Sequence, residues 1–454
     1  MRQLAASNGL SPILVLAALV APAGARANGF ALDIQGLFSN GTASAGAASA
    51  RDPAGQFANP AVLATLEGTQ VVVGGMVIAP RAPYSDHGST LLDGSATLPG
   101  ANGDGGRTGT VPWVFASHRL SQDVSLGFAL ASPFGLSTDY GRGAGFVGRY
   151  QGVESRIEAI AFGPAVAWKA TDRLAIGLGV AARRDTAVVG QALDLGSICA
   201  GQAAANGDPD PVGTCAGLGY VPGASDGYAR YSGNGWGWTL SGGATFEAVP
   251  GTTLGVAYRR ESKGRVKGHE TFDAAAQGFL GFAGEPGAKM DLAFPDFLTV
   301  SAAQRVGRTL SLLAAFQYSF WGRFDTVELV PDDPANGLSV ASKQGFRNAF
   351  RVSAGAVWSV RPGLELFGGA AFEQSPITDR YRQASLPERD SVIVGAGAEA
   401  ALWRSFTVGA AYQRVQMIGS SHVDQAGATG DRLVGSVRGS ADVATVQLGW
   451  RPPG

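Results

Sequence analysis

The chain has 454 residues, 67 of them glycine, and its charged residues make up only 16% of the total while hydrophobic residues make up 45%. A helical membrane protein would be far more apolar and a disordered chain far more charged, so both classes are excluded. The 35 basic and 36 acidic residues nearly cancel, which argues against nucleic acid as a partner. Many glycines and modest hydrophobicity are instead typical of strands that alternate between lipid and a polar lumen.

The first residues have the pattern of a secretory leader. Arg2 supplies a positive end, Ile13 to Val20 form a short apolar core, and Ala25-Arg26-Ala27 is a small-x-small cleavage site. We therefore predict a signal peptide over residues 1–27 and a mature chain that begins near Asn28. The alternative is a retained membrane anchor, but the apolar core is too short to span a bilayer as a stable helix.

From Thr69 onward, apolar and polar residues alternate. Between Trp236 and Glu247 the even positions are apolar or small and the odd positions from 239 are mostly polar, which predicts a strand with one oily face. No window of 18 or more apolar residues follows the leader, so no membrane-spanning helix is predicted. Equivalent apolar rows recur at 254–258, 310–320, 350–358, 364–372, 408–412 and 444–450.

Short turns and long loops separate these strands in alternation. The short turns stand at 170–172, 249–251, 305–308, 361–363 and 402–404, and the long segments at 81–109, 195–230, 271–288, 328–344, 376–388 and 419–437. This rhythm is typical of outer-membrane barrels, in which short turns face the periplasm. The predicted fold class is all-β, a transmembrane antiparallel β-barrel of about 14 strands. A soluble sandwich or propeller would expose too much apolar surface.

Residues 28–68 differ from the barrel predicted over 69–454. They are rich in glycine, alanine and serine and show no sustained alternation. A barrel of this size has a lumen wide enough for solute, so it must be gated or filled unless it is a general porin. We therefore predict that residues 28–68 form an N-terminal plug, or hatch.

The two cysteines, Cys199 and Cys215, lie in one stretch rich in glycine, alanine, aspartate and proline. Export permits a disulfide, and pairing within this stretch would staple a long loop. No histidine or third cysteine lies nearby in the sequence, which argues against a metal or redox site there.

Short fragments in a fixed order cover nearly the whole mature chain. They are Asn28-Gly29-Phe30, Gly41-Thr-Ala-Ser-Ala-Gly46, Asn59-Pro60-Ala61, Ser132-Pro-Phe-Gly-Leu-Ser-Thr138, Gly235-Trp-Gly-Trp238, Tyr258-Arg259, Phe294-Pro295-Asp296, Gly345-Phe-Arg-Asn-Ala-Phe-Arg351 and Phe372-Glu-Gln-Ser-Pro376. Together they resemble the FadL/TodX family of outer-membrane transporters of long-chain fatty acids and other hydrophobic compounds. The resemblance implies a fourteen-stranded barrel with a hatch, an inner pocket near the N-terminus, and sideways exit of the ligand at a kinked third strand.

The predicted exit lies at Ser132-Pro133-Phe134-Gly135 in the third strand. Pro133 has no N–H for the hydrogen-bond ladder and Gly135 loosens the strand two residues later, so the residues themselves support a kink. The alternative is a strand end or an ordinary bulge.

Two groups of hatch residues are predicted to be functional. Asn28-Gly29-Phe30 is the start of the hatch, and Phe30 and Leu32, which alternate with polar neighbours, are predicted to reach into the ligand pocket and move when ligand arrives. Asn59-Pro60-Ala61 form an anchor, because Asn and Pro fix a tight turn and Ala permits close packing. The alternatives are passive packing for the first group and a plain turn into the first strand for the second.

The candidate ligand pocket rests on the same resemblance. The basic pair with which fatty-acid transporters of the family hold a carboxylate would fall near Gln191 and Glu328, and neither is basic. Either a nearby arginine substitutes or the ligand has no carboxylate and is an uncharged hydrocarbon or aromatic compound. The candidate pocket residues are therefore Phe30, Leu32, Arg183, Arg184, Gln191, Arg323 and Glu328.

No enzyme is predicted. The Gly-x-Ser-x-Gly elbow is missing from the sequence, and the alternative of a membrane phospholipase rests only on His118 or His269. We expect no cofactor and no metal, with a hydrophobic ligand and outer-membrane lipid as partners of a monomer. The predicted function is passive transport of hydrophobic compounds, and the alternative is a general or structural porin-like barrel.

Overall fold

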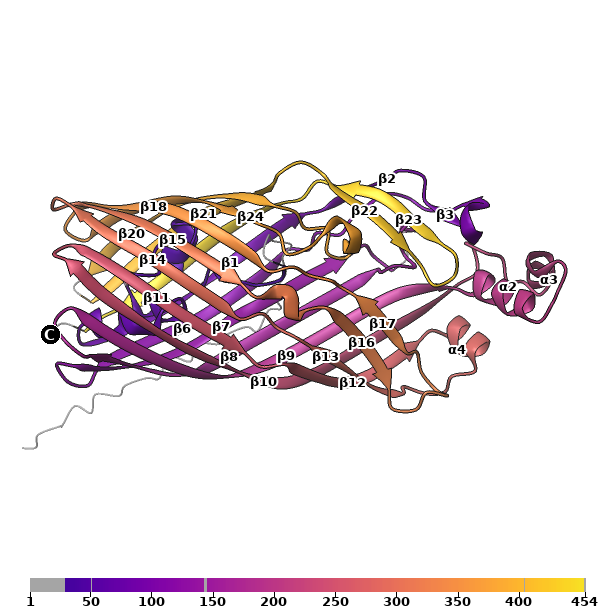
Figure 1. Cartoon of the computed structure of the whole chain (residues 1–454), viewed down its shortest axis with the longest axis horizontal. Helices are drawn as coiled ribbons and strands as arrows, with labels where there is room; N and C mark the ends of the chain where they lie inside the picture. Colours follow the sequence, from indigo (N-terminus) through magenta and orange to yellow (C-terminus); the bar gives the residue numbers. More distant parts are fainter. Residues whose placement is uncertain (1–28, 50, 143–144, 404, 453–454) are drawn as a thin grey trace, which may run out of the picture.

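The computed structural model describes residues 29–49, 51–142, 145–403 and 405–452. The predicted signal peptide over 1–27 and the predicted hatch residue Asn28 lie outside the described residues. Within them, the chain forms one long antiparallel barrel with an N-terminal segment inside it (Figure 1). No helix among them is long and apolar enough to cross a membrane.

The barrel wall consists of eighteen sheet segments in one closed order, and they make fourteen strands because four strands are each broken once. The ten unbroken strands are β1 (Thr69–Arg81), β6 (Gly109–Arg119), β7 (Val124–Asp139), β8 (Glu154–Lys169), β9 (Leu174–Asp194), β10 (Asp226–Val249), β19 (Leu364–Glu373), β20 (Ser391–Trp403), β21 (Phe406–Met417) and β24 (Ser440–Trp450). The broken ones are β11 (Thr252–Glu261) with β12 (Gly264–Phe272), β13 (Gly287–Leu292) with β14 (Phe297–Val306), β15 (Leu310–Ser319) with β16 (Thr326–Pro331), and β17 (Val340–Lys343) with β18 (Ala349–Arg361).

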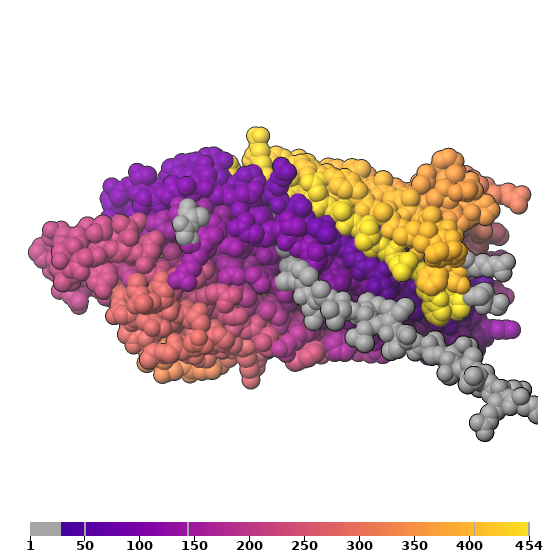
Figure 2. Space-filling model, turned by 180° about the vertical axis from the view of Figure 1, so that it is seen from behind, coloured from indigo at the N-terminus to yellow at the C-terminus, as the bar shows by residue number. Residues whose placement is uncertain are grey.

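The first and last strands close the barrel. β1 pairs with β24 from Val71 opposite Trp450 to Arg81 opposite Ser440. Figure 2 shows this seam, where the yellow C-terminal strand lies against the indigo N-terminal one. The predicted transmembrane antiparallel β-barrel of about 14 strands is confirmed.

The outer face of the wall is oily, as the alternation predicts. On β10 the even-numbered Trp236, Trp238, Leu240 and Phe246 are 44–56% exposed, while odd-numbered residues such as Thr239 and Thr245 are buried. Side chains that face lipid in a membrane appear as exposed apolar residues in the isolated chain. The band of exposed apolar residues therefore marks the part of the wall that contacts the bilayer.

The long loops build a cap on one end of the barrel (Figure 1). A small second sheet contains β2 (Pro83–Asp86), β3 (Thr90–Leu91), β4 (Ala96–Thr97), β5 (Gly103–Asp104), β22 (Ser421–Ala426) and β23 (Arg432–Val437), with the turn η3 (Leu92–Gly94) beside it. The other cap elements are α2 (Leu195–Ala205), α3 (Pro211–Gly217), α4 (Ala274–Leu280) and η5 (Asp379–Tyr381), whereas η4 (Trp321–Arg323) lies in the wall, in the break between β15 and β16. The loop predicted over 328–344 is shorter than expected, because β16 and β17 extend the wall into it.

A disulfide joins α2 to α3 within this cap. Cys199 and Cys215 are bonded, with their Cα atoms 5.9 Å apart. This bond closes a loop of the kind that the clustering of the two cysteines predicts, at the far end of the molecule from the hatch (Figure 1).

The N-terminal segment crosses the lumen. It contains α1 (Leu37–Gly41), η1 (Pro53–Phe57) and η2 (Pro60–Thr65). α1 contacts β19, β20, β21 and β24, whereas η2 contacts β8, β9 and β10, which lie on the opposite part of the wall. We call residues 29–66 the hatch.

Candidate ligand cavity, hatch and wall opening

The hatch begins in an aromatic cage. Phe30 is 1% exposed, and its ring centroid lies 4.8 Å from that of Trp321 and 5.2 Å from that of Phe324. Gly29 precedes it with φ +67°, and a Cβ at that position would lie 2.6 Å from the Trp321 ring. Because only glycine combines this backbone conformation with such a close approach, Gly29 fixes how Phe30 enters the cage.

β7 is kinked where the exit is predicted. Its register against β8 shifts between Ala131 and Phe134, so that Ser132 and Pro133 oppose a single residue of β8. Pairing with β6 runs only from Arg119 opposite Ser125 to Val114 opposite Leu130. Beyond Leu130, the edge of β7 that faces β6 is therefore not paired with β6. This unpaired region is a break in the wall.

The hatch occupies this break from inside. The backbone N–H of Leu32 donates to the carbonyl of Pro133 at 2.8 Å, and the N–H of Gly135 donates to the carbonyl of Phe30 at 2.9 Å. The Gln35 side chain donates to the carbonyl of Ser132 at 2.9 Å. A short strand-like stretch of hatch thus replaces β6 as the partner of the kink.

The other end of the hatch is tied to the wall at Asn59. Its side chain caps η2 by accepting from the Ala61 N–H at 3.0 Å, and it donates to the carbonyl of Ala244 at 3.2 Å. A Cβ at Gly243 would lie 2.2 Å from the Asn59 side chain, and a Cβ at Gly177 would lie 2.4 Å from the Ala61 nitrogen. Glycines in the wall therefore let the Asn59-Pro60-Ala61 turn lie flush against it.

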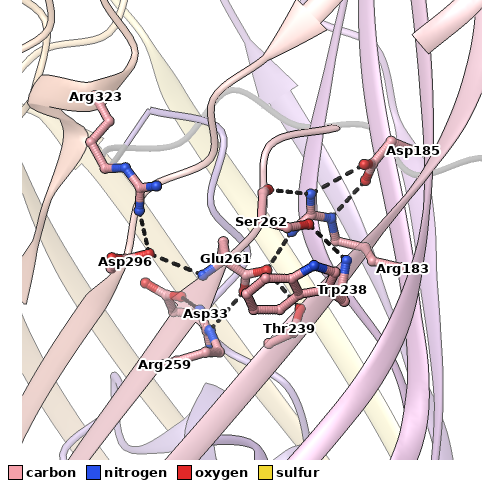
Figure 3. A network of polar contacts seen from close by, with 10 residues as sticks. All are labelled: Asp33, Arg183, Asp185, Trp238, Thr239, Arg259, Glu261, Ser262, Asp296 and Arg323. Carbon is pink, nitrogen blue, oxygen red and sulfur yellow. Dashed lines mark hydrogen bonds and ion pairs between the residues drawn. The ribbon is translucent and has the colours of Figure 1, made fainter. Parts of the chain in front are cut away.

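A buried network of charges joins the hatch to the wall beneath the cage (Figure 3). Asp33 of the hatch accepts from Arg259 at 2.8 Å, and Arg259 lies 3.3 Å from Glu261. Glu261 also pairs with Arg183, which binds Asp185 at 2.7 Å. Charges taken out of water need such partners, because an unpaired one would be costly.

Two further arginines extend the network. Arg351 binds Glu373, with Nε 2.6 Å from the carboxylate, and approaches Asp33 at 3.8 Å. Arg323 binds Asp296 at 2.5 Å, and Asp296 accepts from the Glu261 backbone N–H at 3.0 Å. Asp33 is therefore held by arginines from two separate strands, β11 and β18.

We expect Arg183→Met to destabilise the barrel by about 3–5 kcal/mol, because it leaves Asp185 buried without its cation and leaves Glu261 with Arg259 alone. Arg184→Met is the matched control. Arg184 faces outward, bonded to Asn234 and stacked over Trp236, and its loss should cost less than about 1 kcal/mol. Guanidinium unfolding of the detergent-solubilised barrel, followed by tryptophan fluorescence, measures both, and equal losses would contradict the assignment.

A cavity of about 500 Å³ lies above Phe30, inside the barrel and beneath the cap. Its walls are largely apolar, with Leu136 and Ile157 from β7 and β8 and Met290 and Leu292 from β13. The volume is in the usual range for a small-molecule site. Phe30 of the hatch forms part of its lining.

The cavity lining contains polar side chains, among them the amides of Gln151, Gln191, Gln344, Gln383 and Gln425, but few charged ones. Arg230 is the basic side chain among the described lining residues, and it binds Glu154 at 3.0 Å. Tyr150 donates a hydrogen bond to Asp226 at 2.5 Å. Its burial, and to a lesser extent this hydrogen bond, raise the pKa of its phenol. Tyr150 therefore lines the cavity as a neutral group.

The structure separates the predicted pocket residues into different places. Phe30 and Gln191 line the cavity. Leu32 is buried in a neighbouring cluster with Trp113 and Phe115 of β6. Glu328 is exposed between Val327 and Leu329, which line the cavity, so its side chain is on the outer face of β16.

The predicted arginines are also outside the cavity lining. Arg183 is fully buried in the network below it, and Arg323 binds Asp296 in the same network. Arg184 is on the outer face of β9. The three arginines thus hold the wall and hatch together or face outward, and none of them lines the cavity.

Sequence reasoning missed the residues that surround Phe30 and Asp33. Trp321 and Phe324 come from the break between β15 and β16, and Phe294 from the break between β13 and β14. Asp33 is one of only two carboxylates in the hatch, with Asp52, in a segment of mostly small residues, a signal that could have marked it as a partner for buried arginines.

A closed barrel with an oily belt, filled by its own N-terminal segment, defines a plugged outer-membrane channel. The family model described as outer membrane protein transport protein (OMPP1/FadL/TodX) matches residues 17–451. The chain belongs to this family and to the outer membrane.

Individual relatives agree with this membership. The long-chain fatty acid transport protein of Salmonella typhi is 25% identical over 393 residues, covering 83% of this chain and 85% of the relative. The crystal structure of a Pseudomonas aeruginosa FadL homologue is 20% identical, with a TM-score of 0.81 over 93% of this chain and 99% of that one. The P. putida toluene transporter TodX is 18% identical, with a TM-score of 0.68 over 93% and 100%. The structural likenesses establish the shared fold.

Proposed function

We propose that this protein is a passive transporter of hydrophobic compounds and has no enzymatic activity. The observation that carries the proposal is the apolar cavity above Phe30, whose base is the end of the hatch. A ligand bound there contacts the hatch directly. The named relatives, a long-chain fatty acid transport protein and a toluene transporter, support hydrophobic cargo.

The proposed route follows from the contacts of the hatch. Ligand in the cavity displaces Phe30 from its aromatic cage, and the attached backbone then withdraws from Pro133 and Gly135. Withdrawal uncovers the edge of β7 that β6 leaves unpaired. An oily ligand leaves through this gap into the bilayer, where its apolar surface stays out of water.

The charges of the cavity favour an uncharged cargo. A carboxylate that leaves water is held most strongly by a cation, and the lining arginine, Arg230, is already bound to Glu154, so that only neutral donors such as the lining glutamines remain. An aromatic or aliphatic hydrocarbon has no such requirement. We therefore assign hydrocarbons as the preferred class over long-chain fatty acids.

Uptake measurements test this assignment. Cells that produce the protein should take up radiolabelled toluene much faster than cells without it, long-chain fatty acid more slowly, and sucrose no faster than the background. Equal rates for sucrose and toluene would mean a general porin. Equal rates for fatty acid and toluene would contradict the preference for uncharged cargo.

Gln191→Arg provides the converse measurement. Gln191 lines the cavity, and an arginine there supplies the cation that a carboxylate lacks in the wild type. Uptake of fatty acid should rise relative to toluene in this variant. An unchanged ratio would show that the cavity charges do not select the cargo.

A further inference from the structure

A cluster of basic side chains lies on the outside of the barrel, away from the cavity and the hatch. Lys263 stands between β11 and β12, Lys267 lies in β12 and Lys289 in β13, and all three side chains are exposed. Arg260 and Arg265 are exposed on the same strands, and Arg184 is on the outer face of neighbouring β9. We call these six residues the outer basic patch.

The patch begins where the oily belt ends. Trp236 of β10 is opposite Arg184 on one neighbouring strand and Arg265 on the other. Asn234 is the next residue of β10 toward the cap whose side chain faces outside, and it is opposite Lys267. Trp236 is 56% exposed and Trp238 is 44% exposed. Exposed tryptophans mark the interface of a bilayer, so the patch lies at the level of lipid headgroups. Figure 1 shows β12 and β13 between the body of the barrel and the cap.

The side of the membrane follows from the loops. The patch lies toward the long segments that form the cap, including α4, and the short turns are at the opposite end of the same strands (Figure 1). Short turns of outer-membrane barrels face the periplasm. The patch therefore faces the outer leaflet.

The lysines of the patch have no directly bonded partner among the described residues, although the Asp291 carboxylate attracts Lys263 and Lys289 from a longer distance. Lys267 and Lys289 are directly opposite one another on β12 and β13, and like charges in such a pair repel. No described residue forms an ion pair or side-chain hydrogen bond with Lys263, Lys267 or Lys289, whereas Arg265 binds Asp291 at 2.8 Å. An external anion between the lysines would relieve the repulsion.

Acidic residues do not neutralise the patch. Among the described residues of this face, Asp291 is engaged by Arg265, Asp332 lies at Gly287, two residues from Lys289, and Glu328 lies at the border, on β16 beyond β13. Glu285 lies further toward the cap, 3.7 Å from His269. The patch therefore keeps a net positive charge at the membrane surface. Basic clusters at this level attract anionic lipid headgroups.

We propose that the outer basic patch binds the phosphorylated headgroup of a glycolipid of the outer leaflet. The lysines contact phosphate, and the lipid's acyl chains lie against Trp236 and Trp238 below. Soluble phosphate has no acyl chains to use this second surface. The site is separate from the transport route, since its side chains face outward from strands whose other face lines the lumen.

The test uses the full-length barrel in detergent, titrated with purified lipid A and followed by native mass spectrometry. The triple variant Lys263→Gln, Lys267→Gln, Lys289→Gln should bind lipid A on the order of 100-fold more weakly, because each basic residue near an anionic surface contributes several-fold. Dephosphorylated lipid A should bind the wild type as weakly as lipid A binds the variant.

The matched control removes the same charge from the other end of the barrel. Arg305→Gln, Arg308→Gln and Arg361→Gln change exposed residues at the short turns and should leave lipid A binding unchanged. Heat-dependent migration on gels checks that each barrel is folded, and the double variant Lys267→Gln, Lys289→Gln replaces the triple one if folding fails.

Three results would overturn the proposal. One is equal lipid A binding by the wild type and the lysine variant. Another is equal binding of phosphorylated and dephosphorylated lipid by the wild type. The third is displacement of lipid A by millimolar inorganic phosphate, which would define a site for a soluble anion.

Discussion

A disulfide between positions 31 and 134 should abolish uptake, and reduction should restore it. Ala31 of the hatch and Phe134 of β7 form an antiparallel bridge flanked by the two backbone hydrogen bonds of the kink. In this type of pair the Cα atoms are about 4.5 Å apart, within the range that a disulfide spans. The double variant Ala31→Cys, Phe134→Cys therefore locks the hatch to the wall. If ligand must displace the hatch, transport stops.

The controls separate locking from damage. Each single cysteine variant should transport, with Phe134→Cys losing some stability because Phe134 packs 4.5 Å from Phe294. The wild type must be assayed with the same reductant, since Cys199 and Cys215 are themselves bonded. Undiminished uptake by the oxidised double variant would contradict movement of the hatch at this point.

Deletion of Pro133 should remove uptake while leaving the barrel folded. Two residues of β7 oppose one of β8 at the kink, so removing one restores a continuous register. A regular β7 can pair with β6 beyond Leu130 and closes the break in the wall. Toluene uptake and heat-dependent gel migration measure the two effects.

A second deletion serves as the matched control. β18 has a similar irregularity between Ser359 and Arg361, at the short turn that leads to β19. Deleting Val360 removes one residue from that irregularity, far from the hatch contacts, and uptake should continue. If both deletions leave uptake intact, the ligand leaves elsewhere.

The alternation of side chains was sufficient to predict the barrel. Strands with one apolar face can form few stable structures in a membrane, because every strand edge must be paired there, and a closed barrel meets this requirement. The same regularity explains why the loss of alternation before Thr69 pointed to a plug. Pro133 could be interpreted locally, because a missing N–H interrupts a ladder in any context.

The contents of the lumen could not be predicted in the same way. The hatch is built of one short α-helix and two 3-10 turns, and the position of the second turn depends on wall glycines, Gly177 and Gly243, that are far away in the sequence. The aromatic cage comes from breaks within strands, and the alternation gives no sign of these breaks. The outward orientation of Arg184 and Glu328, however, could have been predicted from the alternation of side chains along their strands. Arg184, for example, continues the outward row of Leu178 and Val180.

The seam between β1 and β24 sets a condition on how the molecule is assembled. It joins residues near 71 to residues near 450, almost the largest separation that the chain allows. Contacts so distant in sequence carry a high entropic cost and tend to form late. The hatch directly precedes β1 along the chain. Once the seam has formed, the hatch is enclosed by a continuous ring of hydrogen bonds, so it is packed in place as the ring closes rather than threaded in afterwards.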